Sequence, residues 1–279
     1  MQGKNKTLDT CINVLDILAK LFVILIMAFP FFWMISTALQ TLKETISVPL
    51  TLWPAELQWV NFVEVFKKID VLTYLRNSII VCVSVVTLQF FVIVPCAYSL
   101  AKYDYKAKPL VFAMVLLGQM IPMQLTFLPV YFMFSKAGLI NNYLSMILPF
   151  ISNPFGIFML RQYFMQVPTE IIEAAKMDNA SELKVMFKIM VPMVKSALIT
   201  IGLLSFISNW NNYFWALIMT NTDSVRTLPI GISLLKNAET LQRWNVIMAG
   251  NLLLVLPMLL LYIVASKKIR NAFVYSGIK

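Results

Sequence analysis

Four polar residues recur at helical spacing in one strongly apolar stretch, and their side chains suit hydrogen bonding rather than bond-making chemistry. The positions i, i+3, i+4 and i+7 are occupied by Ser205, Ser208, Asn209 and Asn212. This spacing would place all four on one face of a helix. An Asn amide both donates and accepts hydrogen bonds, so it matches the hydroxyl groups of a polar solute. Because polar side chains are costly toward lipid, the face is expected either to line an aqueous path or to bond to a neighbouring helix.

Three other residues are candidates for the same path. Gln119 and Asn153 lie in two apolar stretches that prolines interrupt, and Tyr213 follows the polar face directly and offers a ring for stacking. Proline bends or breaks a helix, and broken backbone at membrane depth is tolerated only where protein or water covers it. Both stretches should therefore be bent and should face a bundle interior or a cavity, although each kink could equally be structural only.

The sequence offers little for catalysis or metal binding. It contains no His, the commonest general base and metal ligand. No Asp or Glu falls inside the apolar stretches, whereas carriers driven by protons or sodium usually need a carboxylate there. No glycine-rich phosphate-binding loop is present. Cys11, Cys82 and Cys96 are too few and too internal for a disulfide framework. We expect no catalytic residue, no metal and no nucleotide on this chain, so energy should come from another protein.

The elements that must position these residues are membrane spans. Apolar residues make up 59% of the 279, charged residues 13%, and the mean hydropathy is +0.77, outside the range of soluble proteins. A spanning helix needs roughly 20 apolar residues. We therefore predict an all-α membrane protein with six transmembrane helices within residues 21–266. The six stretches are about 21–42, 78–100, 109–135, 143–165, 196–219 and 246–266.

Charge and periodicity at the two ends predict the orientation. Residues 1–20 form an N-terminal segment with apolar residues at helical spacing, typical of an amphipathic helix on the inner membrane surface, and residues 267–279 form a short tail. Six spans put both ends on one side, where fifteen of the 23 Lys and Arg fall. Since Lys and Arg in short loops stay cytoplasmic, both termini are predicted to be cytoplasmic. Topology and anionic lipid headgroups explain the net charge of +10 without nucleic acid.

Segment 169–192 is the one soluble-looking interruption between spans, and its first half predicts a short helix. Thr169 is a good N-cap, and acidic residues in the first turn suit the positive end of the helix dipole. Asp178 and Asn179 are expected to end the helix, because Asn adopts the left-handed conformation more readily than other non-glycine residues.

A turn and a second helix should follow. Ser181 would cap this second helix over 182–191. In the first helix Glu173 offers charged hydrogen bonds, and the small side chains of Ala174 and Ala175 let another surface approach closely. On physics alone, docking onto a partner and lying at the lipid headgroups are evenly balanced.

A resemblance to a known family rests first on residues 173–192, EAAKMDNASELKVMFKIMVP. This stretch resembles the cytoplasmic EAA loop of permease subunits of binding-protein-dependent ABC importers. Four further stretches resemble the carbohydrate branch of this family, in particular the smaller transmembrane subunit of maltose-type importers. They are FMLRQYFMQVPTEIIEAA, SNWNNYFWAL, NSIIV and MIPMQLTFLPVY. The resemblance covers about Phe22 to Ser266. Asn179 stands where the family has Gly, a replacement that costs about 1 kcal/mol in a left-handed turn.

The resemblance implies the type I ABC importer permease fold in a bacterial cytoplasmic membrane, with a cytoplasmic coupling helix between spans 4 and 5. It implies a second homologous permease subunit in a heterodimer, two cytosolic ATPases and an external solute-binding protein. ATP and Mg would be bound by the ATPases, and in this family the larger permease subunit holds most of the bound sugar. The ATPase contact would be made by Glu173, Ala174, Ala175, Asp178 and Asn179.

The sequence is compatible with three functions. The first is a permease subunit that is not itself an enzyme and that moves a sugar or oligosaccharide into the cell. The second is the same scaffold serving a modified solute, a polyol or glycerol phosphate. The third is an autonomous channel, which would need no docking loop and would conduct without ATP.

Overall fold

The computed structural model describes residues 6–236 and 242–274, and helices are the only regular elements among them. Two compact units divide the chain, one comprising Met1–Ile69 and Ile232–Leu256 and the other Asp70–Gly231 and Pro257–Lys279. The elements in chain order are α1 (Lys6–Ala38), α2 (Leu42–Thr45), α3 (Val60–Lys68), α4 (Val71–Lys102), α5 (Lys108–Met120), α6 (Met123–Lys136), α7 (Tyr143–Ile147), η1 (Leu148–Phe150), α8 (Pro154–Gln166), α9 (Thr169–Met177), α10 (Glu182–Lys184), η2 (Val185–Met190), α11 (Val191–Met193), α12 (Lys195–Trp210), α13 (Tyr213–Met219), α14 (Leu228–Ser233) and α15 (Trp244–Val274).

Within the described ranges, three helical stretches are long and apolar enough to cross a membrane: Ile12–Ala38, Val71–Lys102 and Trp244–Ile263. Three further pairs of helices pass the same test together but are bent at a short break. The bends are 99° between α5 and α6, 40° between Tyr143–Phe150 and α8, and 81° between Glu182–Met193 and α12. The predicted breaks in the third and fourth stretches are therefore confirmed.

Two predicted boundaries differ from the structure. The helix α1 runs without a break past residue 20, so the N-terminal segment is not a separate helix, and α1 ends at Ala38 rather than near residue 42. The predicted fifth span, 196–219, is divided between α12 and α13. The interruption falls at Asn211 and Asn212, whose side chains hydrogen-bond to backbone groups at the end of α12 and the start of α13.

A buried polar cluster joins distant segments of the first unit. The Asn61 side chain donates from Nδ2 to the carbonyl oxygens of Ala38 and Gln40, at 2.9 Å each. Asn245 donates from its Nδ2 to Asn61 Oδ1 at 2.9 Å. Because unpaired polar groups are costly inside a protein, these bonds fix the loop after α1 against the start of α15.

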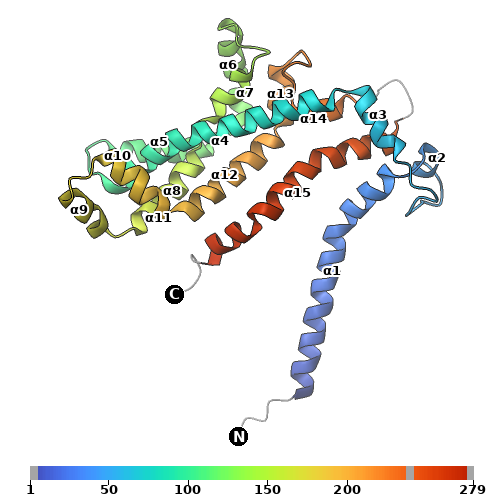
Figure 1. Cartoon of the computed structure of the whole chain (residues 1–279), viewed down its shortest axis with the longest axis horizontal. Coiled ribbons are helices and arrows are strands. Elements are labelled where there is room, and N and C mark those ends of the chain that lie inside the picture. Colours follow the sequence, from blue (N-terminus) through green and yellow to red (C-terminus); the bar gives the residue numbers. More distant parts are fainter. Residues whose placement is uncertain (1–5, 237–241, 275–279) are drawn as a thin grey trace. The chain divides into compact units, whose positions relative to one another are not determined.

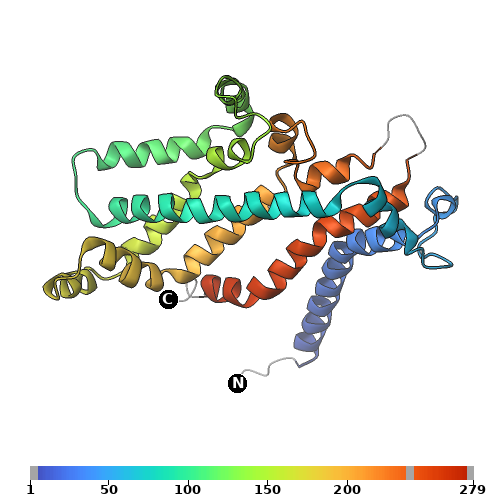
Figure 2. The ribbon, with the colours of Figure 1, turned by 45° about the horizontal axis from the view of Figure 1, so that its top comes forward.

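In the second unit, α4 is the central helix. It packs against α8 and α12, and α5 packs against α8 (Figure 1). After the loop that follows α4, α5 runs back in the opposite direction (Figure 2). One apolar cluster of this unit includes Val94, Leu160 and Phe164. Contacts among α4, α8 and α12 therefore hold the polar residues of these helices near one another.

Gly156 lets the three helices approach closely. A Cβ atom at this position of α8 would lie 2.9 Å from Ile93 Cδ1 on α4 and 3.1 Å from Ile201 Cγ2 on α12. Gly156 follows the break in the fourth stretch by a few residues, so a close crossing of three helices lies beside the break.

Candidate functional site

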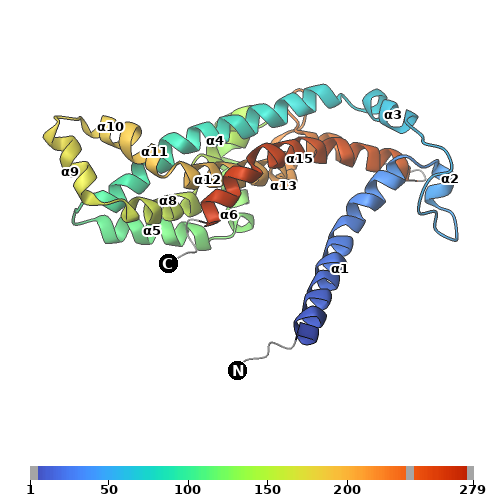
Figure 3. The same ribbon diagram turned by 60° about the horizontal axis from the view of Figure 1, so that its bottom comes forward.

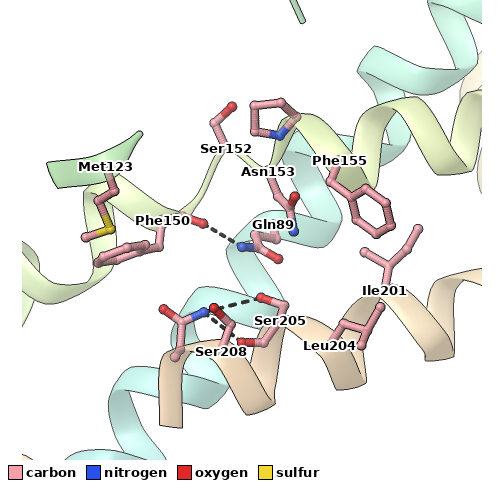
Figure 4. Close-up of a pocket in the computed structure, with 12 residues that line it drawn as sticks. Gln89, Met123, Phe150, Ser152, Asn153, Phe155, Ile201, Leu204, Ser205 and Ser208 are labelled. Carbon is pink, nitrogen blue, oxygen red and sulfur yellow. Dashed lines mark hydrogen bonds between the residues drawn. The ribbon is translucent and has the colours of Figure 1, made fainter. Parts of the chain in front are cut away.

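The polar residues of the second unit meet around a cavity of about 390 Å³. Its wall comes from α4, α8 and α12, together with Met123 and the segment around the break in the fourth stretch (Figure 4). The lining residues are Gln89, Met123, Phe150, Ser152, Asn153, Pro154, Phe155, Ile201, Leu204, Ser205, Ser208 and Asn209. Four of the predicted path residues, Asn153, Ser205, Ser208 and Asn209, are therefore brought together.

Some polar groups of α12 bond within the helix, and others face the cavity. Asn209 Nδ2 donates to the carbonyl oxygen of Ser205 at 2.8 Å and approaches Ser205 Oγ at 3.4 Å. Ser205 is buried, Asn209 is half-buried and Ser208 is exposed. The hydrogen bonds fix the Asn209 amide along its own helix, so Ser208 presents the freer polar group at the cavity wall.

Gln89 is a polar lining residue that the sequence analysis missed. It is buried on α4 and donates from Nε2 to the carbonyl oxygen of Phe150 at 2.6 Å (Figure 4). Phe150 ends η1 at the break, so the bond satisfies a carbonyl group that has no α-helical partner. A polar side chain inside the apolar stretch 78–100 was the signal that could have found it.

Asn153 and Gln119 lie at the same break but in different environments. Asn153 is the N-cap of α8 and accepts the Gly156 N–H on Oδ1 at 3.0 Å, so one part of its amide serves the helix. Gln119 is exposed near the end of α5 and is 3.5 Å from the Pro154 carbonyl oxygen. It is not among the residues that line this cavity.

The predicted single face of four polar residues is wrong at its last member. The helix α12 ends at Trp210, and Asn212 caps the next helix by accepting the Trp215 N–H at 3.3 Å. Asn211 turns back and donates to the Ile207 carbonyl oxygen at 3.0 Å. Short amide side chains compete with backbone groups in this way and end helices. Tyr213 is exposed and does not line the cavity.

Among the described residues, the cavity wall is uncharged and mixes polar with apolar groups. It combines amide and hydroxyl groups with apolar surface from Phe150, Phe155 and Leu204. Such a wall can exchange hydrogen bonds with hydroxyl groups and pack against the apolar faces of a ring. In the described residues no group of three or more His, Cys, Asp or Glu could hold a metal ion.

The first helix of segment 169–192 has two distinct faces. Ile172 and Ala175 are buried in the apolar cluster of the second unit. The exposed face carries residues spaced i, i+3, i+4 and i+7, which are Glu170, Glu173, Ala174 and Met177. Ala175 is therefore used for internal packing, whereas Glu173 and Ala174 are free to meet another surface.

The start of this helix differs from the prediction. Thr169 is the first helical residue of α9, and Pro168 takes the extended N-cap position. Proline sets the backbone for helix entry through its fixed φ. No side chain caps this end.

The end of α9 agrees with the prediction. Asn179 has a φ of 55°, which is left-handed. The Asn179 N–H donates to the Lys176 carbonyl oxygen, and the Ala180 N–H donates to the Ala175 carbonyl oxygen, both at 3.0 Å. These two bonds form a Schellman motif, which closes the helix and turns the chain toward α10. Asp178 is exposed at the C-cap position.

The second helix is less regular than predicted. Ser181 occupies the N-cap position, but it accepts the Val185 N–H through its backbone carbonyl at 2.9 Å and makes no side-chain cap. A π-helical segment, η2, replaces the α-helix from Val185 to Met190. Pro192 lies inside α11, and the chain changes direction at Val194.

Glu182 is the charged centre of this loop, and the sequence analysis did not single it out. Its Oε1 pairs with Lys176 Nζ at 2.8 Å, and its Oε2 accepts the Tyr98 hydroxyl at 3.4 Å. The hydrogen bond from Lys176 has the largest effect on the pKa of Glu182 and the bond from Tyr103 the next largest. Both hold this pKa below its usual value. The carboxylate is therefore ionised at neutral pH.

Comparisons with known proteins show what this chain is similar to. Residues 93–269 match the family model described as binding-protein-dependent transport system inner membrane component. The arabinooligosaccharides transport system permease protein of Halalkalibacterium halodurans is 29% identical over 92% of this chain and 93% of its own length. The lactose transport system permease protein of Rhizobium radiobacter is 30% identical over 84% of this chain and 85% of its own length.

A solved structure supports the fold. A chain of a bacterial ABC transporter involved in the import of the acidic polysaccharide alginate superposes with a TM-score of 0.83 and 23% identity. The match covers 96% of this chain and 98% of the other. The fold is therefore that of a type I ABC importer permease.

Proposed function

Because the chain belongs to the family of binding-protein-dependent transport system inner membrane components, we propose that it is the permease subunit of an ATP-driven importer for a sugar or oligosaccharide. The family consists of membrane transport components rather than enzymes. Two of its relatives are named for arabinooligosaccharides and lactose, which are uncharged and rich in hydroxyl groups. Others are named for sulfoquinovosyl glycerol and sn-glycerol-3-phosphate, which add an anionic group to a hydroxyl-rich body.

The observation that carries the proposed substrate class is the wall of the cavity. Gln89, Asn153, Ser208 and Asn209 supply neutral hydrogen-bonding groups, and none of the described residues that line the cavity is charged. Neutral amides can pair with hydroxyl groups without leaving a buried charge uncompensated. This wall forms one side of the solute path, which the second permease subunit completes in a heterodimer.

The exposed face of α9 forms the proposed contact with a cytosolic ATPase. Glu173 would make charged hydrogen bonds there, Ala174 would allow close approach, and the highly exposed Met177 would fill an apolar depression of the partner. Asp178 and Asn179 would lie at the edge of this contact. Two ATPases bind ATP and Mg and close on ATP, and this closure moves α9 and rocks the helices between inward-open and outward-open states.

The proposed setting is the bacterial cytoplasmic membrane, crossed several times, with lipid around the apolar helices and both termini in the cytoplasm. A solute-binding protein on the outer side delivers the sugar, in keeping with the name of the family. The excess of Lys and Arg on the side of segment 169–192 supports this orientation.

The proposal is tested in liposomes with the chain copurified with its partners and the solute-binding protein. The sugar used is the one that raises the thermal stability of the solute-binding protein, and its uptake should require ATP. Ala174→Leu should abolish assembly with the ATPases, because the larger side chain would clash with them. Ala137→Leu, the same change at an exposed alanine outside segment 169–192, should leave assembly intact. Solute flux without ATP would show a channel instead, and normal uptake by Ala174→Leu would remove α9 from the contact.

A further inference from the structure

Three side chains meet around the carboxylate of Glu182 beside the proposed coupling helix, and the four residues come from three segments. Lys176 is in the last turn of α9, Glu182 begins α10, and Tyr98 and Tyr103 stand in the last turn of α4 and directly after it. Figure 3 shows α9 and α10 at the end of the unit where α4 passes into α5. The segment that would bear the ATPase is therefore joined to α4 at this point.

Glu182 uses both carboxylate oxygens in this junction. Lys176 Nζ lies 2.8 Å from Oε1, and the Tyr98 hydroxyl donates to Oε2 at 3.4 Å. The Tyr103 side chain also hydrogen-bonds to Glu182. Lys176 Nζ lies 6.0 Å from the centroid of the Tyr103 ring, within reach of a cation–π attraction.

The α4 side of the junction is rigid. Tyr98 is buried, and its ring meets those of Tyr103 and Phe164 edge to face, with centroids 5.7 Å and 5.9 Å away. Edge-to-face packing favours one ring orientation, so the Tyr98 hydroxyl is held at a fixed place. The packing therefore restricts rotation of the Tyr98 ring.

The route along the chain from α9 to the cavity is less regular. From Glu182 onward it runs through the π-helical segment η2 and the bend at Val194 before it reaches α12. A π-helical segment departs from the α-helical hydrogen-bond pattern and is a common place for a helix to kink. The route through α4 stays within one helix from Tyr98 to Gln89, about 14 Å along its axis at the usual rise per residue, and Pro95 lies inside this stretch, so one backbone N–H is missing from it.

We propose that Glu182 is the positioning residue that transmits movement of α9 to α4, so that docking of the ATPase acts on the Gln89 side of the cavity. This proposal rests on the proposed function, because it assigns a route for the same coupling. Through its ion pair with Lys176, Glu182 moves together with α9. Its hydrogen bonds with the hydroxyl groups of Tyr98 and Tyr103 transmit this movement to α4. Loss of the carboxylate would leave only the less regular route through η2.

The test compares the transport and the ATP hydrolysis of reconstituted complexes. Glu182→Gln keeps the side-chain size and removes the charge, and the matched control Glu56→Gln makes the same change at an exposed glutamate of the other unit. In Glu182→Gln we expect assembly and ATP hydrolysis to stay within about twofold of the wild type. Solute transported per ATP hydrolysed should fall by about fivefold or more.

A charge reversal separates positioning from folding. Glu182→Lys should uncouple transport from ATP hydrolysis, and Lys176→Glu combined with Glu182→Lys should restore part of the coupling, because the ion pair is rebuilt with opposite polarity. Transport per ATP equal to the wild type in Glu182→Gln would overturn the proposal. A parallel loss of assembly, hydrolysis and transport, with no rescue in the double variant, would also overturn it by showing a folding role. A wild-type complex without ATP-dependent uptake would instead refute the proposed function, and this inference would fall with it.

Discussion

Gln89 Nε2 donates a 2.6 Å hydrogen bond to the carbonyl oxygen of Phe150, which joins the middle of α4 to the broken backbone beside the cavity. Both groups are removed from lipid by this contact, so the bond allows a break at membrane depth. The cavity wall and the stability of the break therefore depend on the same side chain.

The first prediction concerns this bond. Gln89→Leu should lower the free energy of unfolding by about 1–3 kcal/mol, because the Phe150 carbonyl loses its donor in a buried place. Gln119→Leu is the control, since its amide is exposed and lies 3.5 Å from its acceptor. The control should change stability by less than about 0.5 kcal/mol. Denaturant titration in detergent measures both, and equal stability of the two variants would contradict a structural role for Gln89.

A second prediction contrasts two asparagines with positive φ. Asn179 (φ 55°) is exposed, whereas Asn141 (φ 61°) also accepts on Oδ1 from the N–H groups of Asn221 and Thr222, at 3.0 Å each. Asn179→Gly should be neutral, while Asn179→Val should cost about 1–2 kcal/mol because the left-handed region disfavours a branched side chain. Asn141→Gly should destabilise despite its compatible backbone, since the hydrogen bonds are lost. Thermal unfolding measures these changes. If Asn179→Val unfolds at the same temperature as the wild type, position 179 is not in a left-handed turn.

A third prediction compares two helical glycines. A Cβ at Gly156 would lie 2.9 Å from Ile93 Cδ1, but a Cβ at Gly202 would lie 3.6 Å from Val86 Cγ1, an ordinary contact. Gly202→Ala should be neutral or stabilise by up to about 1 kcal/mol through helix propensity. Gly156→Ala should instead destabilise by about 1 kcal/mol or more, because the crossing is overpacked. Chemical unfolding of the two variants measures the difference. A similar increase in the free energy of unfolding at both positions would show that the crossing at Gly156 is not tight.

The fourth prediction concerns water in the cavity. In a background without Cys11, Cys82 and Cys96, single cysteines are introduced as Ser208→Cys and Asn209→Cys, with Ile207→Cys and Phe214→Cys as controls. Water-soluble thiol reagents should label the first two at a rate that changes with the nucleotide state of the complex, because these positions line the cavity. The controls lie off its wall and should be protected. Protection of all four would leave packing between helices as the role of the polar face.

Sequence alone determined the helical class, the breaks in the third and fourth apolar stretches and the turn after α9, because each depends on local chemistry. Runs of apolar residues require helices in a membrane, Pro122 and Pro154 mark the two predicted breaks, and Asn179 suits a left-handed turn whatever surrounds it. The resemblance of residues 173–192 to a known loop identified the family, which the comparison over residues 93–269 confirmed.

Tertiary structure decided which side chains meet. Ala174 and Ala175 are equivalent in sequence, yet only Ala175 is buried against the core, because the orientation of α9 depends on what it packs against. Asn212 matched a helical period that the chain leaves at Trp210, since capping by its side chain outweighs continuation of the helix. Gln89 and Phe150 are 61 residues apart in sequence, as Tyr98 and Glu182 are 84 apart, and no local pattern records such contacts. Periodicity reports one helix at a time, whereas the cavity and the junction at Glu182 arise only where several helices pack together.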